Sequence, residues 1–284
     1  MQKLLKQMMK MDQLLKNKQN IKRAGHALAF LVLGLFMSSC DFTPRIHKDI
    51  LIAQNHISNQ EYAQAVKQYH KILEMAPNDE IKIKINYQIA ELYAVSLGQY
   101  NRGIAFYEKI PKLTTDPVWL VKTQERIGEI AFLYINDYAK AAEVYNKLSA
   151  FRPKLSNHDL YEFRLARSYI KLKEYDKATE HLVSMHNNGN HKYFVDSFFQ
   201  SGIMYFESQD WNRAVQYFRE YIKREDRRDL KVRAIFLMAN CYETLERLQT
   251  AYDLYYSILG EYPNNKVIQD RLNSVYERRV ARKR

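Results

Sequence analysis

The sequence predicts an all-α protein built as a solenoid of stacked helix pairs. One pattern of small and aromatic residues recurs six times along the chain, at steps of 36 to 38 residues. Only 8 glycines and 6 prolines occur among 284 residues, which is typical of an almost entirely helical chain rather than of a β-rich domain. A single helix pair cannot bury its own apolar face, so the recurring units are expected to stack on one another.

Residues 202–221 contain the clearest copy of the unit. Gly202 lies in the expected first helix, where its small size lets a second helix approach closely. After a polar turn at 209–210, Trp211, Ala214 and Phe218 follow at steps of three and four, which places them on one helical face. This spacing predicts a short helix–turn–helix whose aromatic side chains fill the gap between its two helices.

The same pattern of small and aromatic residues recurs from residue 45 to residue 265. In every copy an aromatic residue or a leucine precedes the small residue of the second helix by three positions. A proline follows the second helix of three copies, at 77, 153 and 263, where proline ends a helix. The small residues of the second helices are Ala65, Gly103, Ala141, Ala178, Ala214 and Ala251.

This residue pattern resembles the tetratricopeptide repeat (TPR). The resemblance implies a right-handed superhelical solenoid of about six repeats over residues 45–265. The family repeat is about 34 residues long, so the longer steps imply slightly longer helices or turns. The family has a third small residue late in the second helix, and this chain has a larger residue there in every copy. The sequence therefore does not predict how tightly the helices stack. The larger residues are Ile72, Ile110, Leu148, Met185, Tyr221 and Ile258.

Residues 266–284 are predicted to form a capping helix over the last repeat. Val267, Leu272, Val275 and Tyr276 recur at helical intervals and would cover its exposed face. The basic end of this helix could contact anionic lipid headgroups or an acidic partner, and a solvated helix end is the alternative. Its basic residues are Arg278, Arg279, Arg282, Lys283 and Arg284.

Residues 1–39 are predicted to be a signal peptide. Seven basic residues and one acidic residue precede an apolar run over 27–37. As a helix this run spans about 16 Å, roughly half of a bilayer core, so it suits a signal-peptide core better than a membrane anchor. Its removal lowers the formal charge of the chain from +12 to +6, with 37 basic and 31 acidic residues remaining.

The sequence Met37-Ser-Ser-Cys40 resembles a bacterial lipobox. The resemblance implies that Cys40 carries palmitate-type acyl chains and becomes the first residue of the mature protein, with 40–44 as a short tether. One acyl chain binds a membrane only marginally, whereas two or more hold stably. An ordinary signal peptide with an incidental cysteine is the alternative. The second cysteine, Cys241, is predicted to be a small core residue.

Nothing in the sequence predicts an enzyme, a metal site or a cofactor. The chain has no Gly-x-Ser-x-Gly nucleophile, no phosphate loop and no His-Glu-x-x-His motif. His181, His186 and His191 are spaced by five residues, a step that turns a helix by about 500°, so they do not share a face. We therefore predict no catalytic residue and no metal ligand.

A partner-binding surface is implied by the resemblance instead. In tetratricopeptide repeats the first helices line the concave face of the superhelix. The glutamates of copies two and three would make one half of this groove acidic, and the side chains of copies four to six would make the other half aromatic and apolar. Such a groove suits an extended or helical peptide. The alternative is that the aromatic side chains pack within the helix pairs. By register, the positions are Tyr87, Glu91, Glu125, Glu129, Phe132, Phe163, Arg167, Ile170, Phe199, Ile203, Phe206, Phe236 and Asn240.

The sequence therefore predicts a non-catalytic protein–protein interaction scaffold tethered to the bacterial cell envelope. The combination resembles lipoproteins of the outer-membrane β-barrel assembly machine, pilotin lipoproteins of type IV pilus secretins and parts of gliding-motility complexes. The expected location is the periplasmic face of the outer membrane, with the inner membrane as the alternative. The alternative function is an accessory subunit of a cell-wall enzyme or transport system. No nucleic-acid partner is expected for an exported protein without a recognised binding motif.

Overall fold

The computed structural model describes residues 45–75 and 77–282. The predicted signal peptide (1–39), Cys40 with its tether to residue 44, Lys283 and Arg284 lie outside these described residues. Every regular element in the two described ranges is helical, which confirms the predicted all-α class. None of these helices is both long enough and apolar enough to cross a membrane.

The first unit is described over residues 45–75, which form a helix pair. It consists of α2 (Arg45–Ser58) and α3 (Tyr62–Glu74). Ala53 of α2 and Ala65 of α3 are completely buried, as the small-residue pattern predicts. The Gln68 side-chain amide also donates a hydrogen bond of 2.8 Å to Asp49, which joins the two helices.

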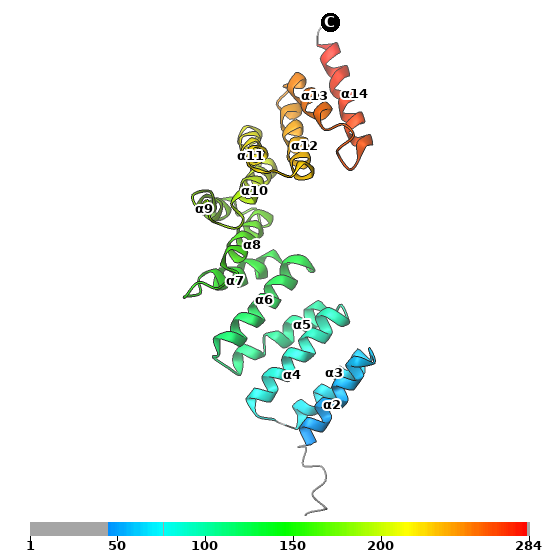
Figure 1. Cartoon of the computed structure of the whole chain (residues 1–284), viewed down its shortest axis with the longest axis vertical. Helices are drawn as coiled ribbons and strands as arrows, with labels where there is room; N and C mark the ends of the chain where they lie inside the picture. The colour runs from blue at the N-terminus through cyan, green and yellow to red at the C-terminus, as the bar shows by residue number, and fades with distance from the viewer. Residues whose placement is uncertain (1–44, 76, 283–284) are drawn as a thin grey trace, which may run out of the picture. The chain divides into compact units, whose positions relative to one another are not determined.

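The second unit begins at Pro77 and continues the same design. Five further helix pairs follow in chain order, and a final unpaired helix, α14, ends the chain (Figure 1). The pairs are α4 (Asp79–Glu91) with α5 (Tyr100–Tyr107), α6 (Pro117–Leu133) with α7 (Tyr138–Ser149), α8 (His158–Lys171) with α9 (Tyr175–His186), α10 (Phe194–Glu207) with α11 (Trp211–Arg224), and α12 (Arg228–Thr244) with α13 (Leu248–Ser257). Helix α14 spans Asn265–Ala281. In the second pair, a π-helical turn η1 (Leu92–Ser96) extends α4, and a 3₁₀ turn η2 (Ile110–Lys112) follows α5.

Several helices of this unit begin at side chains that cap their free backbone amides. Asn78 accepts a 2.9 Å hydrogen bond from the amide of Ile81, and Asp210 accepts one of 3.0 Å from the amide of Arg213. Such caps satisfy amides that have no partner within the helix, and each stabilises the helix by about 1 kcal/mol. The cap at Asp210 explains why the predicted polar turn at 209–210 is also the start of a helix.

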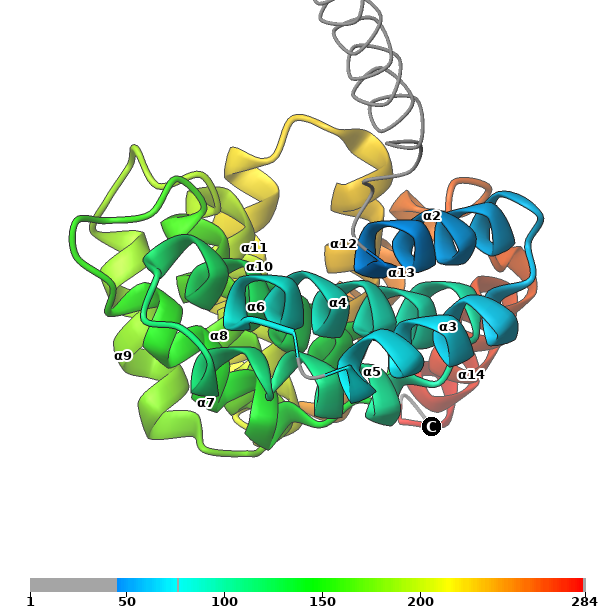
Figure 2. The same ribbon diagram turned by 90° about the horizontal axis from the view of Figure 1, so that it is seen from below.

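Within the second unit each helix packs mainly against the helices before and after it in the chain. Figures 1 and 2 show α9, a second helix, at the outer edge of the stack, with the first helices α8 and α10 on its inner side. The first helices α8 and α10 also contact each other. This arrangement is that of a solenoid, in which the core runs from one repeat to the next.

The stacking within pairs is tight even though the chain lacks the third small residue of the family. All six of the larger residues at that position, from Ile72 to Ile258, are buried in the core. Close approach is provided elsewhere. A Cβ atom added to Gly202 would lie 2.5 Å from the Phe218 ring, so only glycine fits there without a shift.

One residue in the turn of each helix pair adopts a left-handed backbone conformation. In the second pair this residue is Gly98, with φ of 62°. The other five pairs use residues with side chains, namely Gln60, Asn136, Lys173, Gln209 and Glu246. Their steps of 38, 38, 37, 36 and 37 residues equal those of the small residues, so one turn conformation recurs through the whole repeat.

Helix α14 caps the end of the second unit. Its buried residues are Ile268, Leu272 and Val275, and they join the same core as Tyr255 of α13. The prediction that Tyr276 belongs to this face was wrong, because its side chain is 55% exposed. The apolar stripe instead includes Ile268, four residues before Leu272, and this spacing turns Tyr276 away from the core.

Candidate functional site

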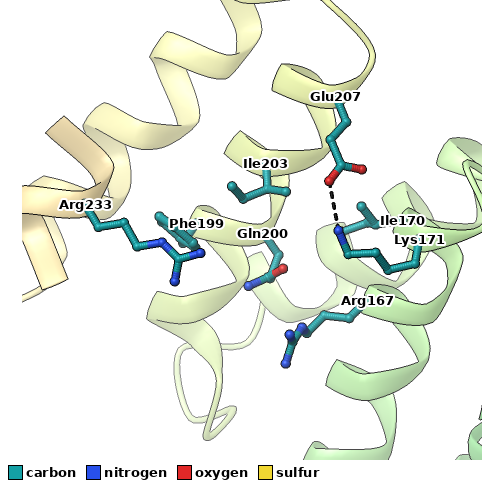
Figure 3. Close-up of a pocket in the computed structure, with 8 residues that line it drawn as sticks. All are labelled: Arg167, Ile170, Lys171, Phe199, Gln200, Ile203, Glu207 and Arg233. Atoms are coloured by element: carbon teal, nitrogen blue, oxygen red, sulfur yellow. Dashed lines mark hydrogen bonds and ion pairs between the residues drawn. The ribbon is translucent and has the colours of Figure 1, made fainter. Parts of the chain in front are cut away.

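The first helices of the last three pairs enclose a pocket of about 280 Å³ (Figure 3). Four of the residues assigned to the partner-binding face line it: Arg167, Ile170, Phe199 and Ile203. Lys171, Gln200, Glu207 and Arg233 complete the lining. The repeat register thus brings together side chains of three successive first helices, of which Arg167 and Arg233 are the farthest apart in sequence.

Helical spacing explains which side chains reach this pocket. On α8, Arg167 and Ile170 are three residues apart and therefore share a face. On α10, Phe199, Ile203 and Glu207 follow at steps of four. Figure 3 shows Arg233, Gln200 and Arg167 extending from three successive first helices toward the same space. The pocket consequently has an apolar wall with polar groups converging on it.

The pocket carries an excess of positive charge. The Lys171 ammonium pairs with Glu207 at 3.0 Å. Arg167 and Arg233, by contrast, have no carboxylate within 4.0 Å among the residues that the structure describes. Arg233 lies over the Phe199 ring at 5.3 Å. Burial lowers the pKa of Arg167, and the nearby Arg164 and Arg233 lower it further.

Arg167 itself is held by aromatic rings. Its guanidinium lies 5.0 Å from the centre of the Phe132 ring and 5.7 Å from that of Phe163. Both rings are buried, and Phe163 stacks on Tyr193 at 4.4 Å. Phe132 and Phe163 were predicted to line the groove, but they support Arg167 from the core instead.

The predicted acidic half of the groove contains a basic residue that the sequence pattern does not reveal. The Arg126 guanidinium donates hydrogen bonds of 2.9 and 3.0 Å to Glu91 and one of 2.6 Å to Glu129. Glu91 also accepts a 2.5 Å hydrogen bond from Tyr107. Glu125 is engaged by the hydroxyl of Tyr161. Arg126 therefore partly offsets the charges of Glu91 and Glu129, and Glu125 keeps its charge while bonded to Tyr161.

The remaining predicted residues of the face make contacts within or between helix pairs. Phe206 packs edge-on against Trp211, and Phe236 stacks on Tyr262. Tyr87 packs against Trp119, and Asn240 donates a hydrogen bond to the carbonyl of Phe236 in its own helix. All four side chains are half-buried, but none of them lines the α8–α10–α12 pocket.

Three residues of the basic C-terminal end also make intramolecular contacts. Arg278 donates hydrogen bonds of 3.0 Å to Glu243 on α12 and 2.7 Å to Glu246 in the turn after it. Arg282 pairs with Glu246 at 2.7 Å, and Arg279 lies over the Tyr252 ring. These contacts fasten α14 to the last pair.

The three histidines considered above do not come together. His181 stacks on Tyr169 and His186 on Phe198, and burial lowers the pKa of both imidazoles. His191 lies next to His158 and two carboxylates instead. Cys241 is buried, as predicted, and burial raises its thiol pKa to about 12.

Comparison with known families identifies the repeats. Two models of the tetratricopeptide repeat match, one over residues 83–113 and one over residues 200–266. These stretches correspond to the second pair and to the fifth and sixth pairs. The protein therefore carries tetratricopeptide repeats within an all-helical solenoid. No curated protein matches the chain by sequence.

Solved structures share this fold at low sequence identity. PilW, described as a widely conserved type IV pilus biogenesis factor, is 16% identical with a TM-score of 0.50, covering 82% of this chain and 99% of PilW. The quorum sensor NprR from B. thuringiensis, without ligand, is also 16% identical with a TM-score of 0.50, covering 92% of this chain and 76% of its own. A chain of the Naa15/Naa10 complex bound to HypK-THB is 16% identical with a TM-score of 0.52, covering 82% of this chain and 39% of its own.

Proposed function

We propose that this protein is a non-catalytic scaffold, tethered to the membrane of a bacterial envelope, which holds a partner protein in the α8–α10–α12 pocket. The supporting observation is that Arg167, Ile170, Phe199 and Ile203, assigned to the partner-binding face by register alone, line one pocket. Their neighbours in the fold, Phe206 and Phe236, lie outside it. We therefore assign partner binding to this pocket rather than to the rest of the face.

The chemistry of the pocket indicates what it would bind. Arg167 and Arg233 present guanidinium groups that have no carboxylate partner among the described residues. Guanidinium groups bind carboxylates through two parallel hydrogen bonds. Ile203 and Phe199 provide an apolar wall beside them. We infer a partner segment that carries an acidic side chain next to an aliphatic or aromatic one.

The envelope assignment rests on the sequence and on one structural relative. The predicted signal peptide and the lipidation of Cys40 would place the repeats, residues 45–265, directly at a membrane surface. PilW, which shares the fold, is described as a pilus biogenesis factor. We therefore favour a role in assembling an envelope machine, for outer-membrane proteins, a pilus secretin or motility, at the periplasmic face of the outer membrane.

Contact with anionic lipid would require a change at the C-terminal helix. Arg278 and Arg282 would have to exchange Glu243 and Glu246 for lipid phosphates. Lys283 and Arg284 could extend such a contact. Lipid on Cys40 would therefore supply most of the membrane affinity, since several acyl chains bind far more strongly than a few exposed cations.

Crosslinking in intact cells tests the tethered scaffold. A tagged wild-type chain and its Cys40→Ser variant are crosslinked and their partners identified by mass spectrometry. Recovery of β-barrel assembly, secretin or motility subunits that is lost with Cys40→Ser is the expected result. Recovery of cell-wall enzymes or transport subunits instead would support an accessory role. If the Cys40→Ser variant recovers the same partners as the wild type, the scaffold does not need the tether.

Charge reversal in the pocket tests the binding site separately. Arg167→Glu and Arg233→Glu should each reduce crosslinking to the same partner at least tenfold, because a carboxylate would then face a carboxylate. Lys223→Glu on α11 is the matched control, since it reverses a charge at an exposed position outside the pocket. Circular dichroism checks that each variant is folded. Equal crosslinking by folded pocket and control variants would rule out this site.

A further inference from the structure

The start of α8 and the loop before α10 form a cluster of two histidines and two carboxylates. His158 is the first residue of α8, and His191 lies in the loop between α9 and α10. Both histidines are only 5% exposed. The carboxylates are Asp159 and Glu162, one and four residues after His158. The cluster lies outside the partner pocket and does not depend on the function proposed for it.

Two buried nitrogens in this cluster have no hydrogen-bond partner. These are Nδ1 of His158 and Nε2 of His191. His158 Nδ1 lies 3.3 Å from a Glu162 oxygen and 3.9 Å from an Asp159 oxygen. His191 Nε2 lies 3.5 Å from the same Glu162 oxygen and 3.8 Å from the same Asp159 oxygen. All four distances exceed those of direct nitrogen–oxygen hydrogen bonds, and buried polar atoms rarely stay unpaired.

We propose that this cluster binds a divalent transition metal ion, Zn²⁺ in the first place, through His158, Asp159 and Glu162. One ligand atom from each of these residues lies within 4.8 Å of the others. An ion bound by nitrogen and oxygen at about 2.0–2.2 Å in a tetrahedron keeps its ligand atoms about 3.3–3.6 Å apart. From His158 Nδ1, the separation of 3.3 Å from Glu162 equals such an edge, and that of 3.9 Å from Asp159 is slightly longer.

The ligand atoms, one imidazole nitrogen and two carboxylate oxygens, favour some metal ions over others. Octahedral Mg²⁺, with bonds of about 2.0–2.1 Å, would need neighbouring ligands only about 2.9 Å apart, and both Mg²⁺ and Ca²⁺ prefer oxygen ligands to imidazole. Imidazole together with carboxylates suits Zn²⁺ and its neighbours in the first transition row. The two negative carboxylates also offset the positive end of the α8 dipole, which by itself would repel a cation.

Two backbone amides of the α9–α10 loop orient the outer part of the site. The Lys192 amide donates a 2.8 Å hydrogen bond to the second oxygen of Asp159. The Tyr193 amide donates to His191 Nδ1 at 3.1 Å. In a neutral ring whose Nδ1 accepts, the proton is on Nε2, so His191 faces the two carboxylates as a donor rather than as a ligand. Such outer partners hold ligating carboxylates in place.

The site would keep a position open to solvent. The side chains of Asp159 and Glu162 are 38% and 24% exposed. Three protein ligands therefore leave room for water, or for one group of another molecule, as the fourth ligand. All three proposed ligands belong to α8, and the loop before α10 contacts them through the Lys192 amide, which donates to Asp159.

Isothermal titration of the untagged full chain with ZnCl₂, after dialysis against EDTA, tests the proposal. The expected result is one Zn²⁺ ion per chain with a Kd at or below the micromolar range, and a higher unfolding temperature in its presence. CoCl₂ should give the visible absorption bands of a tetrahedral site. A stoichiometry near zero for both metals would overturn the proposal.

Matched variants locate the site. Glu162→Gln and Asp159→Asn keep the shape of each side chain, and either should weaken Zn²⁺ binding at least tenfold. Glu180→Gln, which removes an exposed carboxylate from α9, is the control and should bind like the wild type. If one of the two variants fails to fold by circular dichroism, the other decides. Unchanged affinity in a folded Glu162→Gln or Asp159→Asn variant would refute these ligands.

Discussion

At the scale of single residues, the turn of each helix pair depends on one residue with positive φ. Five of these six residues carry side chains, although the left-handed region favours glycine. The conformation closes the first helix locally: after Gln209, the amide of Asp210 bonds the carbonyl of Tyr205, five positions earlier. Gly98 is the one turn residue for which the chain uses glycine.

Gly98→Ala should lower the free energy of unfolding by about 1 kcal/mol, because a Cβ atom disfavours the left-handed conformation. No atom lies within 4 Å of the added Cβ, so backbone strain is the only expected cost. Gly189→Ala is the control, since it also has free space but no positive φ. It should be neutral or slightly stabilising. Urea unfolding of both variants measures the difference, and equal effects would contradict this account.

Residue patterns predicted the repeat well and the site only in part. Ala65, Ala141 and Ala214 identify their helix pairs because the core selects small residues locally, and the structure buries all three. Arg126 was missed because its partner Glu91 lies 35 residues away. His158, Asp159 and Glu162 are close in sequence, but the burial that leaves the His158 Nδ1 atom without a partner depends on the fold. Local spacing reveals helical faces but not contacts between repeats.

At the scale of elements, the second and third pairs are joined by the Glu91–Arg126 contact between α4 and α6. Burial opposes ionisation of Glu91, but hydrogen bonds from Tyr107 and Arg126 outweigh it and hold its pKa below the ordinary value of 4.5. A lowered carboxyl pKa stabilises the fold above the unfolded-state value. That contribution is lost as the pH falls through the lower folded-state pKa.

Glu91→Gln should therefore destabilise the protein at pH 7 by about 1.5–3 kcal/mol, the usual range for hydrogen bonds to a charged group. The difference from the wild type should shrink as the pH falls from 5 toward 3. Glu80→Gln is the control, because Glu80 pairs with Lys84 on an exposed face. Urea unfolding at several pH values measures both. A constant difference across this range would show that the ion pair does not contribute.

At the scale of the second unit as a whole, the helix pairs should not unfold as one cooperative block. Each pair should have its own stability, which depends mainly on the pairs next to it. Each helix packs mainly on its neighbours in sequence, so a local change affects nearby pairs most. Gly202→Ala places a methyl group against Phe218 and should cost about 1–3 kcal/mol by overpacking.

Hydrogen exchange followed by mass spectrometry measures this effect pair by pair. Gly202→Ala should reduce protection in α10, α11 and α12 and leave α4 and α5 nearly unchanged. The wild-type chain under the same conditions is the reference. A uniform loss of protection from α4 to α14 would instead indicate a single cooperative unit and would contradict the nearest-neighbour description.

The sequential packing of these helices also has a mechanical consequence. If the chain is anchored at Cys40 and holds its partner in the α8–α10–α12 pocket, any load between membrane and partner passes through the pairs in between. Such a stack yields by opening one pair at a time, because few contacts connect pairs that are not adjacent. The protein would then lengthen in steps and close again when the load is removed, so that anchor and partner stay connected while the distance between them changes.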